Sequence, residues 1–353
     1  MKLLLTTLVV LIVTSNGVKA QDNFVNYFNQ GIQNFEDQNY NKAATNFSQA
    51  IKNKTSETNS YKLAGAYMQR ALCYNNMGKK AAAMKDIETA LLLKPEFANL
   101  YAIRAQLHLV NKEYNDVIIW ADKGLALKNE NEELMLYKTN AYYGLKNYQK
   151  SIEIADSVLA INSSNTTALK DKGDAYTKLK DFTKAVNEFS KVIAIEPQGI
   201  GAFYNRGIAY ARNMQFKEAL ADTERAMQID SNNNWIGYNN IAYFIKFEEK
   251  DYKGALAYFD KSLKINPKFD YAYNNRGFAK LQLNDLKGAR TDIKKSIALN
   301  ATNCVAYRNL ALILIAEKKE KKACIPLNKA NELGYSKEYN EDVNDLLNKY
   351  CVK

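Results

Sequence analysis

A row of asparagine residues recurs at a nearly constant spacing in the C-terminal half of the chain. Its members, each about one turn into an expected helix, are Asn205, Asn240, Asn275 and Asn309. A side-chain amide carries hydrogen-bond donors and an acceptor, so four such amides can pair with successive backbone groups of an extended polypeptide. Tyr204 and Arg308 lie next to this row and could add side-chain selectivity. The alternative is that asparagine is simply common here and hydrates an exposed helix face.

Patterns typical of enzymes and metal proteins are missing from the sequence. There is a single histidine and no C-x2-C pair, which argues against a zinc site. His108 occupies a position where the corresponding residues are Tyr74 and Tyr142, which favours a packed histidine over a ligand or general base. Glycine-rich phosphate loops, G-x-S-x-G and H-E-x-x-H are also absent. We therefore expect no catalytic residue, cofactor or metal, and predict a protein that is not an enzyme.

Two of the four cysteines are placed so that they could form a disulfide. Cys324 lies near the start of one expected helix and Cys351 at the end of the next, so an antiparallel arrangement puts them at the same end of the pair. Cys73 falls in the middle of a helix on a face that we expect to be buried, and Cys304 lies at the opposite end from Cys324. The alternative is four buried thiols.

A repeat of about 34 residues sets the positions of all these side chains. One complete copy is Thr166–Gly199, in which Leu169, Gly173 and Tyr176 fall at i, i+4 and i+7 on one helical stripe. A short polar turn and a second apolar stripe follow, and Pro197 closes the copy. Steps of one period along the first apolar position give Tyr67, Tyr101, Met135, Leu169 and Phe203. Each copy predicts a helical hairpin that can bury its stripes only against similar neighbours.

The period is not constant along the chain. The interval from Pro95 to Pro197 is three whole periods, whereas the interval from Pro197 to Pro267 is two periods with a remainder of two. Two extra residues must therefore lie between Ser231 and Tyr252. Near the N-terminus the polar stretch Asn53–Ser60 contains a six-residue insertion between the first two copies.

The repeated pattern resembles the tetratricopeptide repeat, a helix-turn-helix unit of about 34 residues. The likeness covers residues 23–334, about nine copies. In the first helix it rests on an aromatic residue, a Leu, a Gly or Ala, and a Tyr, in that order. In the rest of the copy it rests on Ala, Phe, a second Ala and a closing Pro. It implies an all-α, right-handed superhelix whose first helices line a concave groove. In some members of the family an asparagine ladder at the corresponding place binds a peptide backbone.

The end of the chain is expected to close the stack. Residues 336–353 predict a capping helix with Tyr339, Val343, Leu346 and Leu347 on one side. The stretch from Ala323-Cys324 to Tyr350-Cys351 also resembles the terminal segment of secreted repeat proteins of Bacteroidetes-type bacteria.

The first twenty residues have the layout of a cleavable secretory signal. Lys2 precedes an apolar run from Leu3 to Val13, and Val18-Lys19-Ala20 ends the segment. Eleven apolar residues are too few to span a bilayer, so we expect export with cleavage, no stable membrane insertion of the mature chain, and residence in the periplasm or at the cell surface of a Gram-negative bacterium.

The chain is basic, with 49 Lys and Arg against 38 Asp and Glu. The positive charge is scattered rather than gathered into a stripe, and the densest cluster, Lys318–Lys322, falls in an expected turn, so we expect no nucleic-acid partner. Two hypotheses for the function remain. The first is an interaction scaffold that binds an extended peptide or a partner helix in the groove. The second is a structural or assembly subunit of a cell-envelope complex that packs through its convex face or ends.

Overall fold

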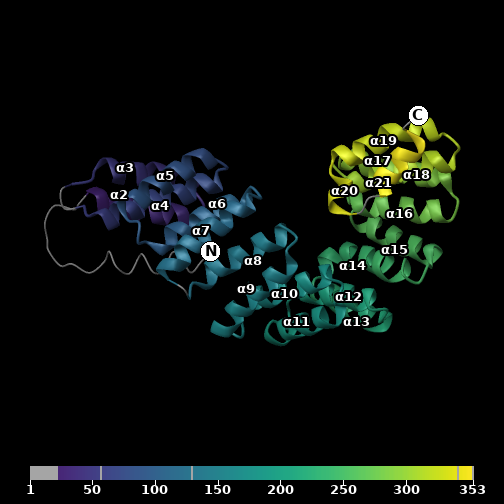
Figure 1. Ribbon diagram of the computed structural model, residues 1–353, viewed down its shortest axis with the longest axis horizontal. Helices are drawn as coiled ribbons and strands as arrows, with labels where there is room; N and C mark the ends of the chain where they lie inside the picture. Colours follow the sequence, from purple (N-terminus) through teal and green to yellow (C-terminus); the bar gives the residue numbers. More distant parts are fainter. Residues whose placement is uncertain (1–22, 56–57, 129, 340–341, 352–353) are drawn as a thin grey trace. The chain divides into compact units, whose positions relative to one another are not determined.

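The computed structural model describes residues 23–55, 58–128, 130–339 and 342–351, and the predicted leader lies outside these residues. Within them the chain forms helices and no strand, which confirms the expected all-helical repeat fold (Figure 1). Two compact units can be distinguished, unit 1 up to Ala175 and unit 2 from Tyr176. The boundary falls within helix α10 (Thr166–Lys178).

Unit 1 is built from consecutive helical hairpins. The first helices of its pairs are α2 (Asn23–Glu36), α4 (Ser60–Asn76), α6 (Ala98–Val110), α8 (Glu132–Gly144) and α10. The second helices are α3 (Tyr40–Lys52), α5 (Lys80–Leu93), α7 (Tyr114–Leu127) and α9 (Tyr148–Ile161). From α2 to α8, each helix packs on its partner in the pair and on the next helix along the chain, as the repeat pattern requires.

Unit 2 continues the same alternation. It contains α11 (Phe182–Ile195), α12 (Ile200–Arg212), α13 (Phe216–Ile229), the 3-10 helix η1 (Ser231–Asn233), α14 (Asn234–Asn240) and the π-helix η2 (Ile241–Lys246). These are followed by α15 (Tyr252–Ile265), α16 (Asp270–Gln282), α17 (Leu286–Leu299), α18 (Cys304–Ala316), α19 (Glu320–Glu332), α20 (Tyr335–Glu338) and α21 (Asp342–Tyr350).

The turn inside each hairpin contains one residue in the left-handed backbone conformation. These residues are Gln38, Gly78, Lys112, Lys146, Lys180, Met214, Lys250, Asn284 and Lys318. In the turn after α10, the Asp181 N–H donates to the Tyr176 carbonyl at 2.9 Å and the Lys180 N–H donates to the Thr177 carbonyl at 3.1 Å. This closure pairs the last carbonyls of the first helix and reverses the chain.

Small residues let the two helices of a pair approach closely. A β-carbon at Gly207 in α12 would lie 3.2 Å from the Ala219 carbonyl oxygen of α13, and one at Gly277 in α16 would lie 3.1 Å from the Ala289 carbonyl oxygen of α17. The alanines at these contacts are fully buried. The predicted small position of the repeat is thus the point of closest helix contact in these two pairs.

The two extra residues predicted between Ser231 and Tyr252 lengthen the turn of one hairpin, because five residues separate η2 from α15 whereas three separate α16 from α17. Helix α13 begins at Phe216 and α15 at Tyr252, an interval two positions longer than the one from α15 to the start of α17 at Leu286. In this interval α14 passes into η2 instead of continuing as an α-helix. α14 and η2 together span 13 residues, as many as α16, so the π-helix changes the winding of this segment and not its length.

The C-terminal segment differs from the single capping helix expected over residues 336–353. Helix α20 ends at Glu338, Tyr339 is 56% exposed, and α21 begins at Asp342. Asp342 accepts from Arg308 of α18, at 2.5 Å from Nη2, so the start of α21 is fixed by an ion pair rather than by continuation of α20. Val343 is fully buried in a cluster with Leu346 and Leu347 packed against it.

The cysteines of this segment are joined in the structure. Cys324 of α19 and Cys351, next to the end of α21, form a disulfide with their Cα atoms 5.6 Å apart. Cys73 and Cys304 are buried and take no part in this bridge. The bridge therefore ties the last helix back to the last hairpin.

Among the helices of the described residues, none is long and apolar enough to cross a membrane.

Candidate binding cavity

A cavity within unit 2, here called the unit-2 cavity, has a volume of about 570 Å³. Its walls come mainly from the first helices α12, α14 with η2, α16 and α18, and from the C-terminal helix α20. Such a volume is in the range of ordinary ligand sites. Because successive first helices line it, a ligand here would run across several repeats.

Aromatic side chains form most of the cavity wall. The residues concerned are Tyr243, Phe244, Phe247, Tyr252, Phe269, Tyr271, Phe278, Tyr335 and Tyr339. Phe247, which follows η2, lies at the centre of this group, with ring centroids 5.4 Å from both Tyr243 and Tyr252 and 5.8 Å from Phe278. Tyr335 and Tyr339 stack at 5.0 Å. The aromatic wall thus depends on the π-helix and on the C-terminal segment.

A chain of side-chain amides crosses the cavity lining from one first helix to the next. The Asn275 Nδ2 group donates to Asn239 Oδ1 at 3.2 Å, and Asn274 Nδ2 donates to Asn275 Oδ1 at 3.2 Å. Asn309 Nδ2 in turn donates to Asn274 Oδ1 at 3.0 Å. These bonds connect α14, α16 and α18, so the amides hold the repeats together as well as facing the cavity.

Three of the six predicted peptide-binding residues line this cavity, namely Asn275, Arg308 and Asn309. Asn309 is only 3% exposed, so its amide acts mainly within the protein. Asn205, Asn240 and Tyr204 are not part of the cavity wall. Burial, with a smaller effect of the Asp230 charge, raises the pKa of Tyr204 to about 12. The unit-2 cavity thus brings together three of the six predicted residues, and the row of four amides as a peptide-binding site stays a prediction.

The amides that meet across the helices follow a second row that the sequence analysis missed. Asn239, Asn274 and Asn309 are also evenly spaced along the sequence and share Asn309 with the predicted row. Two neighbouring asparagines stand at each of the first two positions, so spacing alone could not separate the rows. The hydrogen bonds run between the rows, from Asn275 to Asn239 and from Asn309 to Asn274.

The charged groups at the cavity are paired. Arg212 forms an ion pair with Glu248, and both line the cavity. Arg308 binds Asp342 and also donates from Nη1 to Asn309 Oδ1 at 3.1 Å. Burial raises the pKa of Tyr335, and the charge of Asp342 adds to this rise. A ligand would therefore meet aromatic rings, amides and paired charges rather than a strongly charged surface.

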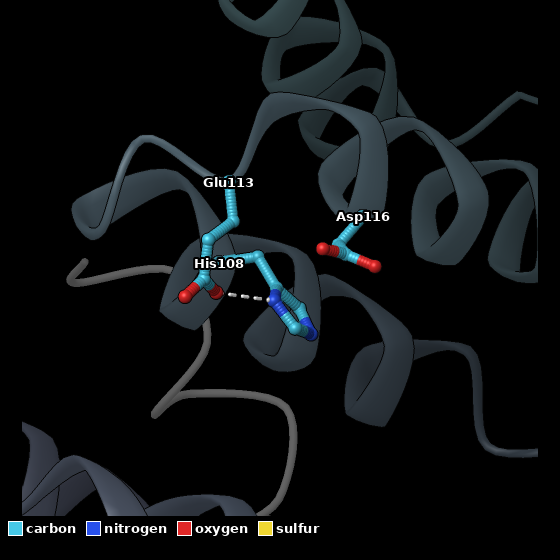
Figure 2. A group of neighbouring side chains, drawn as sticks. All are labelled: His108, Glu113 and Asp116. Carbon is cyan, nitrogen blue, oxygen red and sulfur yellow. Dashed lines mark hydrogen bonds and ion pairs between the residues drawn. The ribbon is translucent and has the colours of Figure 1, made fainter.

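The group formed by His108, Glu113 and Asp116 in unit 1 is the one arrangement among the described residues with metal-ligand types close together (Figure 2). His108 Nδ1 lies 2.7 Å from Glu113 Oε2, and Lys80 Nζ lies 2.7 Å from Glu113 Oε1. A lysine ammonium already occupies one side of the carboxylate, so the geometry is that of a hydrogen-bonded link between α5, α6 and the turn before α7.

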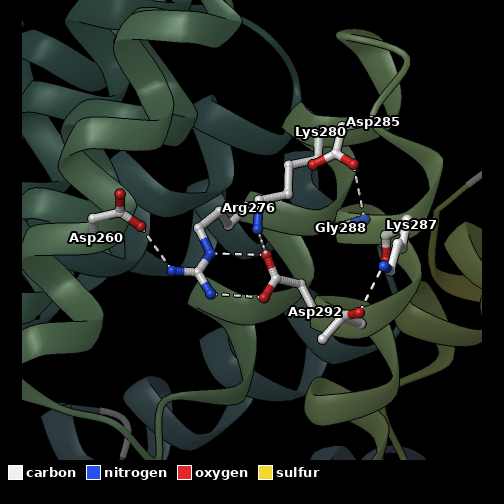
Figure 3. Close-up of polar contacts among 8 residues, drawn as sticks. Asp260, Arg276, Lys280, Asp285, Lys287, Gly288 and Asp292 are labelled. Atoms are coloured by element: carbon white, nitrogen blue, oxygen red, sulfur yellow. Dashed lines mark hydrogen bonds and ion pairs between the residues drawn. The ribbon is translucent and has the colours of Figure 1, made fainter.

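Basic residues at the position before the small residue of the repeat form a second network that sequence reasoning missed. They are Arg70, Arg104, Lys138, Lys172, Arg206 and Arg276. Each of these residues lies in a first helix. It pairs with an acid in the second helix of its own hairpin, in the second helix of the preceding hairpin, or in both. Figure 3 shows the last case, Arg276 between Asp260 of α15 and Asp292 of α17, at 2.7 and 2.6 Å. Their recurrence at one position of the repeat was the available signal.

Comparison with known proteins agrees with the repeat. A model of the TPR repeat matches residues 173–213, and a model of the tetratricopeptide repeat matches residues 64–97, 237–269 and 270–303. The Hsp70-Hsp90 organizing protein 3 of Arabidopsis thaliana is 29% identical over 99 residues, which is 28% of this chain and 17% of that relative. This alignment therefore spans less than a fifth of the relative's length.

Solved structures show the same architecture. A tetratricopeptide repeat protein from Parabacteroides merdae is 17% identical, with a TM-score of 0.56 over 81% of this chain and 97% of that one. PilW, described as a type IV pilus biogenesis factor, is 18% identical, with a TM-score of 0.53 over 59% of this chain and 94% of that one. The family models thus identify tetratricopeptide repeats at residues 64–97, 173–213 and 237–303, and the solved structures share the all-helical repeat fold.

Proposed function

We propose that this chain is a non-enzymatic interaction scaffold whose unit-2 cavity receives an extended polypeptide. The supporting observation is that nine aromatic residues and a chain of amides line one cavity that follows successive first helices. An amide with one or two internal hydrogen bonds retains further donor or acceptor capacity, so Asn239 and Asn275 can still pair with a ligand backbone. Backbone pairing supplies affinity without requiring one sequence.

The aromatic wall supplies the apolar part of the interaction. Tyr271 is 51% exposed and Tyr339 is 56% exposed, so both rings are accessible at the cavity. Exposed tyrosines that contact a partner often contribute much of the binding energy of protein interfaces. A polypeptide with large apolar or aromatic side chains fits this wall. The similarity to a protein named for organizing two other proteins also supports a binding role.

We further propose that the mature chain is exported to the periplasm or cell surface of a Gram-negative bacterium. Its first twenty residues have the composition of a secretory leader, and a disulfide between Cys324 and Cys351 would persist in an oxidising compartment. Cell fractionation combined with N-terminal sequencing tests this proposal. A mature N-terminus at Gln21 in the periplasmic or surface fraction supports it, and an intact N-terminus in the cytosol contradicts it.

The second candidate is an assembly subunit that packs through the outer face of the last hairpin. Ile325 of α19 is 78% exposed, and it borders a shallow apolar depression together with Tyr307, Leu310 and Pro326. An apolar side chain so exposed next to other apolar residues is a feature of packing surfaces. Under this alternative, Ile325→Lys would abolish partner capture while substitutions in the unit-2 cavity would not.

Site-specific photo-crosslinking in intact cells distinguishes the two candidates. A photoreactive phenylalanine analogue replaces Tyr271 in the cavity, Ile325 on α19, or Ile119 on α7, which is 49% exposed and serves as the control. We expect a discrete polypeptide adduct from position 271 and none from position 119, with mass spectrometry identifying the captured segment. Capture from position 325 alone would favour the assembly subunit.

Two asparagines from the predicted row allow a matched comparison of affinity for the captured polypeptide segment. Asn275 lines the cavity and Asn205 does not, although both occupy the same place in their repeats. We expect Asn275→Ala to weaken binding by about threefold to tenfold, because one amide bond contributes ~0.5–1.5 kcal/mol net. Asn205→Ala should leave affinity unchanged. Equal effects of the two changes in a titration would contradict the cavity as the binding site.

A further inference from the structure

A smaller cavity in unit 1, here called the unit-1 cavity, has a volume of about 130 Å³. It is lined by the first helices α2, α4, α6 and α8, as the unit-2 cavity is lined by later first helices. Its apolar wall consists of Phe35, Met68, Leu72, Ile103 and Tyr137. A cavity of this size accepts the end of one side chain rather than a length of polypeptide.

One wall of the unit-1 cavity carries a buried hydrogen-bond acceptor without a partner. Gln69 is 2% exposed, and its Oε1 atom makes no hydrogen bond. A buried carbonyl oxygen without a partner costs the protein free energy, so such atoms are rare in native structures. The Gln69 amide is therefore poorly explained by folding alone, but a donor entering the cavity would satisfy it.

A carboxylate lines the same cavity. Glu133 of α8 accepts a hydrogen bond from the Tyr137 hydroxyl at 2.8 Å. Burial, together with the charge of Glu133, raises the pKa of Tyr137, so the phenol stays protonated and occupies only one of the carboxylate's acceptor sites. No Lys or Arg is among the cavity-lining residues, although the whole chain carries 49 basic residues. The electrostatics of this cavity thus favour a cation.

We propose that the unit-1 cavity binds the cationic, N–H-donating end of one lysine or arginine side chain of a polypeptide. The apolar wall contacts the methylene stem, Glu133 neutralises the charge, and Gln69 Oε1 accepts a hydrogen bond from the head group. A Gln amide can turn either its oxygen or its NH2 group inward, and the neighbouring carboxylate selects a donor as the ligand. This site is separate from the unit-2 cavity and does not depend on the function proposed for it.

Methyl NMR of the full chain tests this site directly, because Met68 lies in the cavity wall. The chain is labelled with ¹³C-methyl methionine, and the Met68 signal is assigned by its loss in Met68→Leu. The probes are Nα-acetyl-arginine amide, Nα-acetyl-lysine amide and the uncharged Nα-acetyl-norleucine amide. We expect a saturable shift of the Met68 signal with the two cationic probes and none with the norleucine derivative at the same concentration.

Variants separate the two polar groups from the apolar wall. Glu133→Gln should lower the affinity for the cationic probes by about tenfold or more, because a hydrogen bond to a charged group is worth more than a neutral one. Gln69→Leu should also lower the affinity, without lowering the melting temperature. Glu130→Gln, an exposed acid in the turn before α8, is the control for general charge and should change neither quantity.

The source of the cation is decided by a fourth probe, the free diamine putrescine. Tighter binding of the acetylated amino acids than of putrescine supports a side chain within a polypeptide, and equal or tighter binding of putrescine overturns that assignment. The site itself is overturned if the Met68 signal responds equally to norleucine and to the cationic probes, if it responds to none, or if Glu133→Gln binds as well as the wild type.

Discussion

The cavities of unit 1 and unit 2 are built from the same part of the repeat but treat their polar side chains differently. In unit 2 the amides of Asn239, Asn274, Asn275 and Asn309 bond to one another across three first helices. In unit 1 the position that corresponds to Asn275 and Asn309 holds Gln69, whose buried oxygen has no partner. One repeat position therefore holds amides bonded to one another in unit 2 and a buried amide oxygen without a partner in unit 1.

Asp171 in α10 of unit 1 occupies the same repeat position as Gln69, Asn275 and Asn309. Burial, reinforced by the charge of Asp174, raises the pKa of Asp171 to about 7, against a hydrogen bond from Asn140 that lowers it. The folded state then binds a proton more tightly than the unfolded state, whose ordinary value is 3.8. This contribution to stability is complete below about pH 4 and lost as the pH rises through 7.

We expect Asp171→Asn to remove this loss. The free energy of unfolding of the variant should then exceed that of the wild type by up to ~4 kcal/mol above pH 7 and by little near pH 4. Denaturant unfolding of both proteins at several pH values measures the difference. Glu130→Gln, at an exposed acid in the turn before α8, is the control and should show no such trend. A pH-independent difference between Asp171→Asn and the wild type would contradict the raised pKa.

The disulfide should make unit 2 depend on redox state where unit 1 does not. Cys351→Ser opens a loop of 27 residues and should destabilise the C-terminal helices by ~2–4 kcal/mol. Hydrogen exchange followed by mass spectrometry should show faster exchange in α18–α21 and unchanged exchange in α2–α8. Non-reducing peptide mapping of the wild type should recover Cys324 joined to Cys351. Alkylation of both as free thiols would end the prediction.

Removing one amide from each cavity should have opposite effects on stability. Asn309→Leu leaves the Asn274 oxygen without its donor in a buried place, so we expect a loss of ~1–3 kcal/mol. Gln69→Leu removes an oxygen that has no partner, so stability should stay the same or rise. Urea unfolding measures both changes. A loss at Gln69 as large as that at Asn309 would remove the distinction between the two cavities.

The smallest effect is expected in the hairpin turns, where the two units should behave alike. Lys180 in unit 2 has φ near +62°, which disfavours residues with a β-carbon. Lys180→Gly should stabilise the folded protein by ~0.5–1 kcal/mol. Gly78→Lys in unit 1, where φ is +69°, should destabilise it by a similar amount. Thermal unfolding of the two variants measures this. Changes of the same sign in both would show that backbone conformation is not the cause.

Much of the fold could be predicted because it depends on periodicity. The regular steps of the repeat located the hairpins, the small residues at helix contacts such as Gly207 and Gly277, and the interval with two extra residues. The left-handed turn residues could not be read in the same way, since most of them are lysines rather than glycines. There the hydrogen bonds that close each hairpin decide the conformation, and residue type gives little indication.

The binding cavity was only partly predictable. Spacing identified Asn275, Arg308 and Asn309, but it could not show that Asn309 is buried or that Asn239 and Asn274 complete the chain of amides. The aromatic wall depends on which way Phe247 and its neighbours turn after η2, and on the separation of α20 from α21. Both are consequences of three-dimensional packing at places where the repeat pattern is interrupted.

The π-helix η2 also interrupts the row of basic residues. Where the row has Arg206 and Arg276 in the neighbouring hairpins, this hairpin has Ile241, and the Arg212–Glu248 pair joins it to α12 beside the buried apolar contacts. The two side chains are 38% and 33% exposed, against 18% and 5% for Arg276 and Asp292. Salt screens exposed pairs more than buried ones. Raising the ionic strength should therefore weaken the Arg212–Glu248 pair more than the Arg276–Asp292 pair, while the buried apolar contacts of Ile241 and Ile245 keep this junction closed.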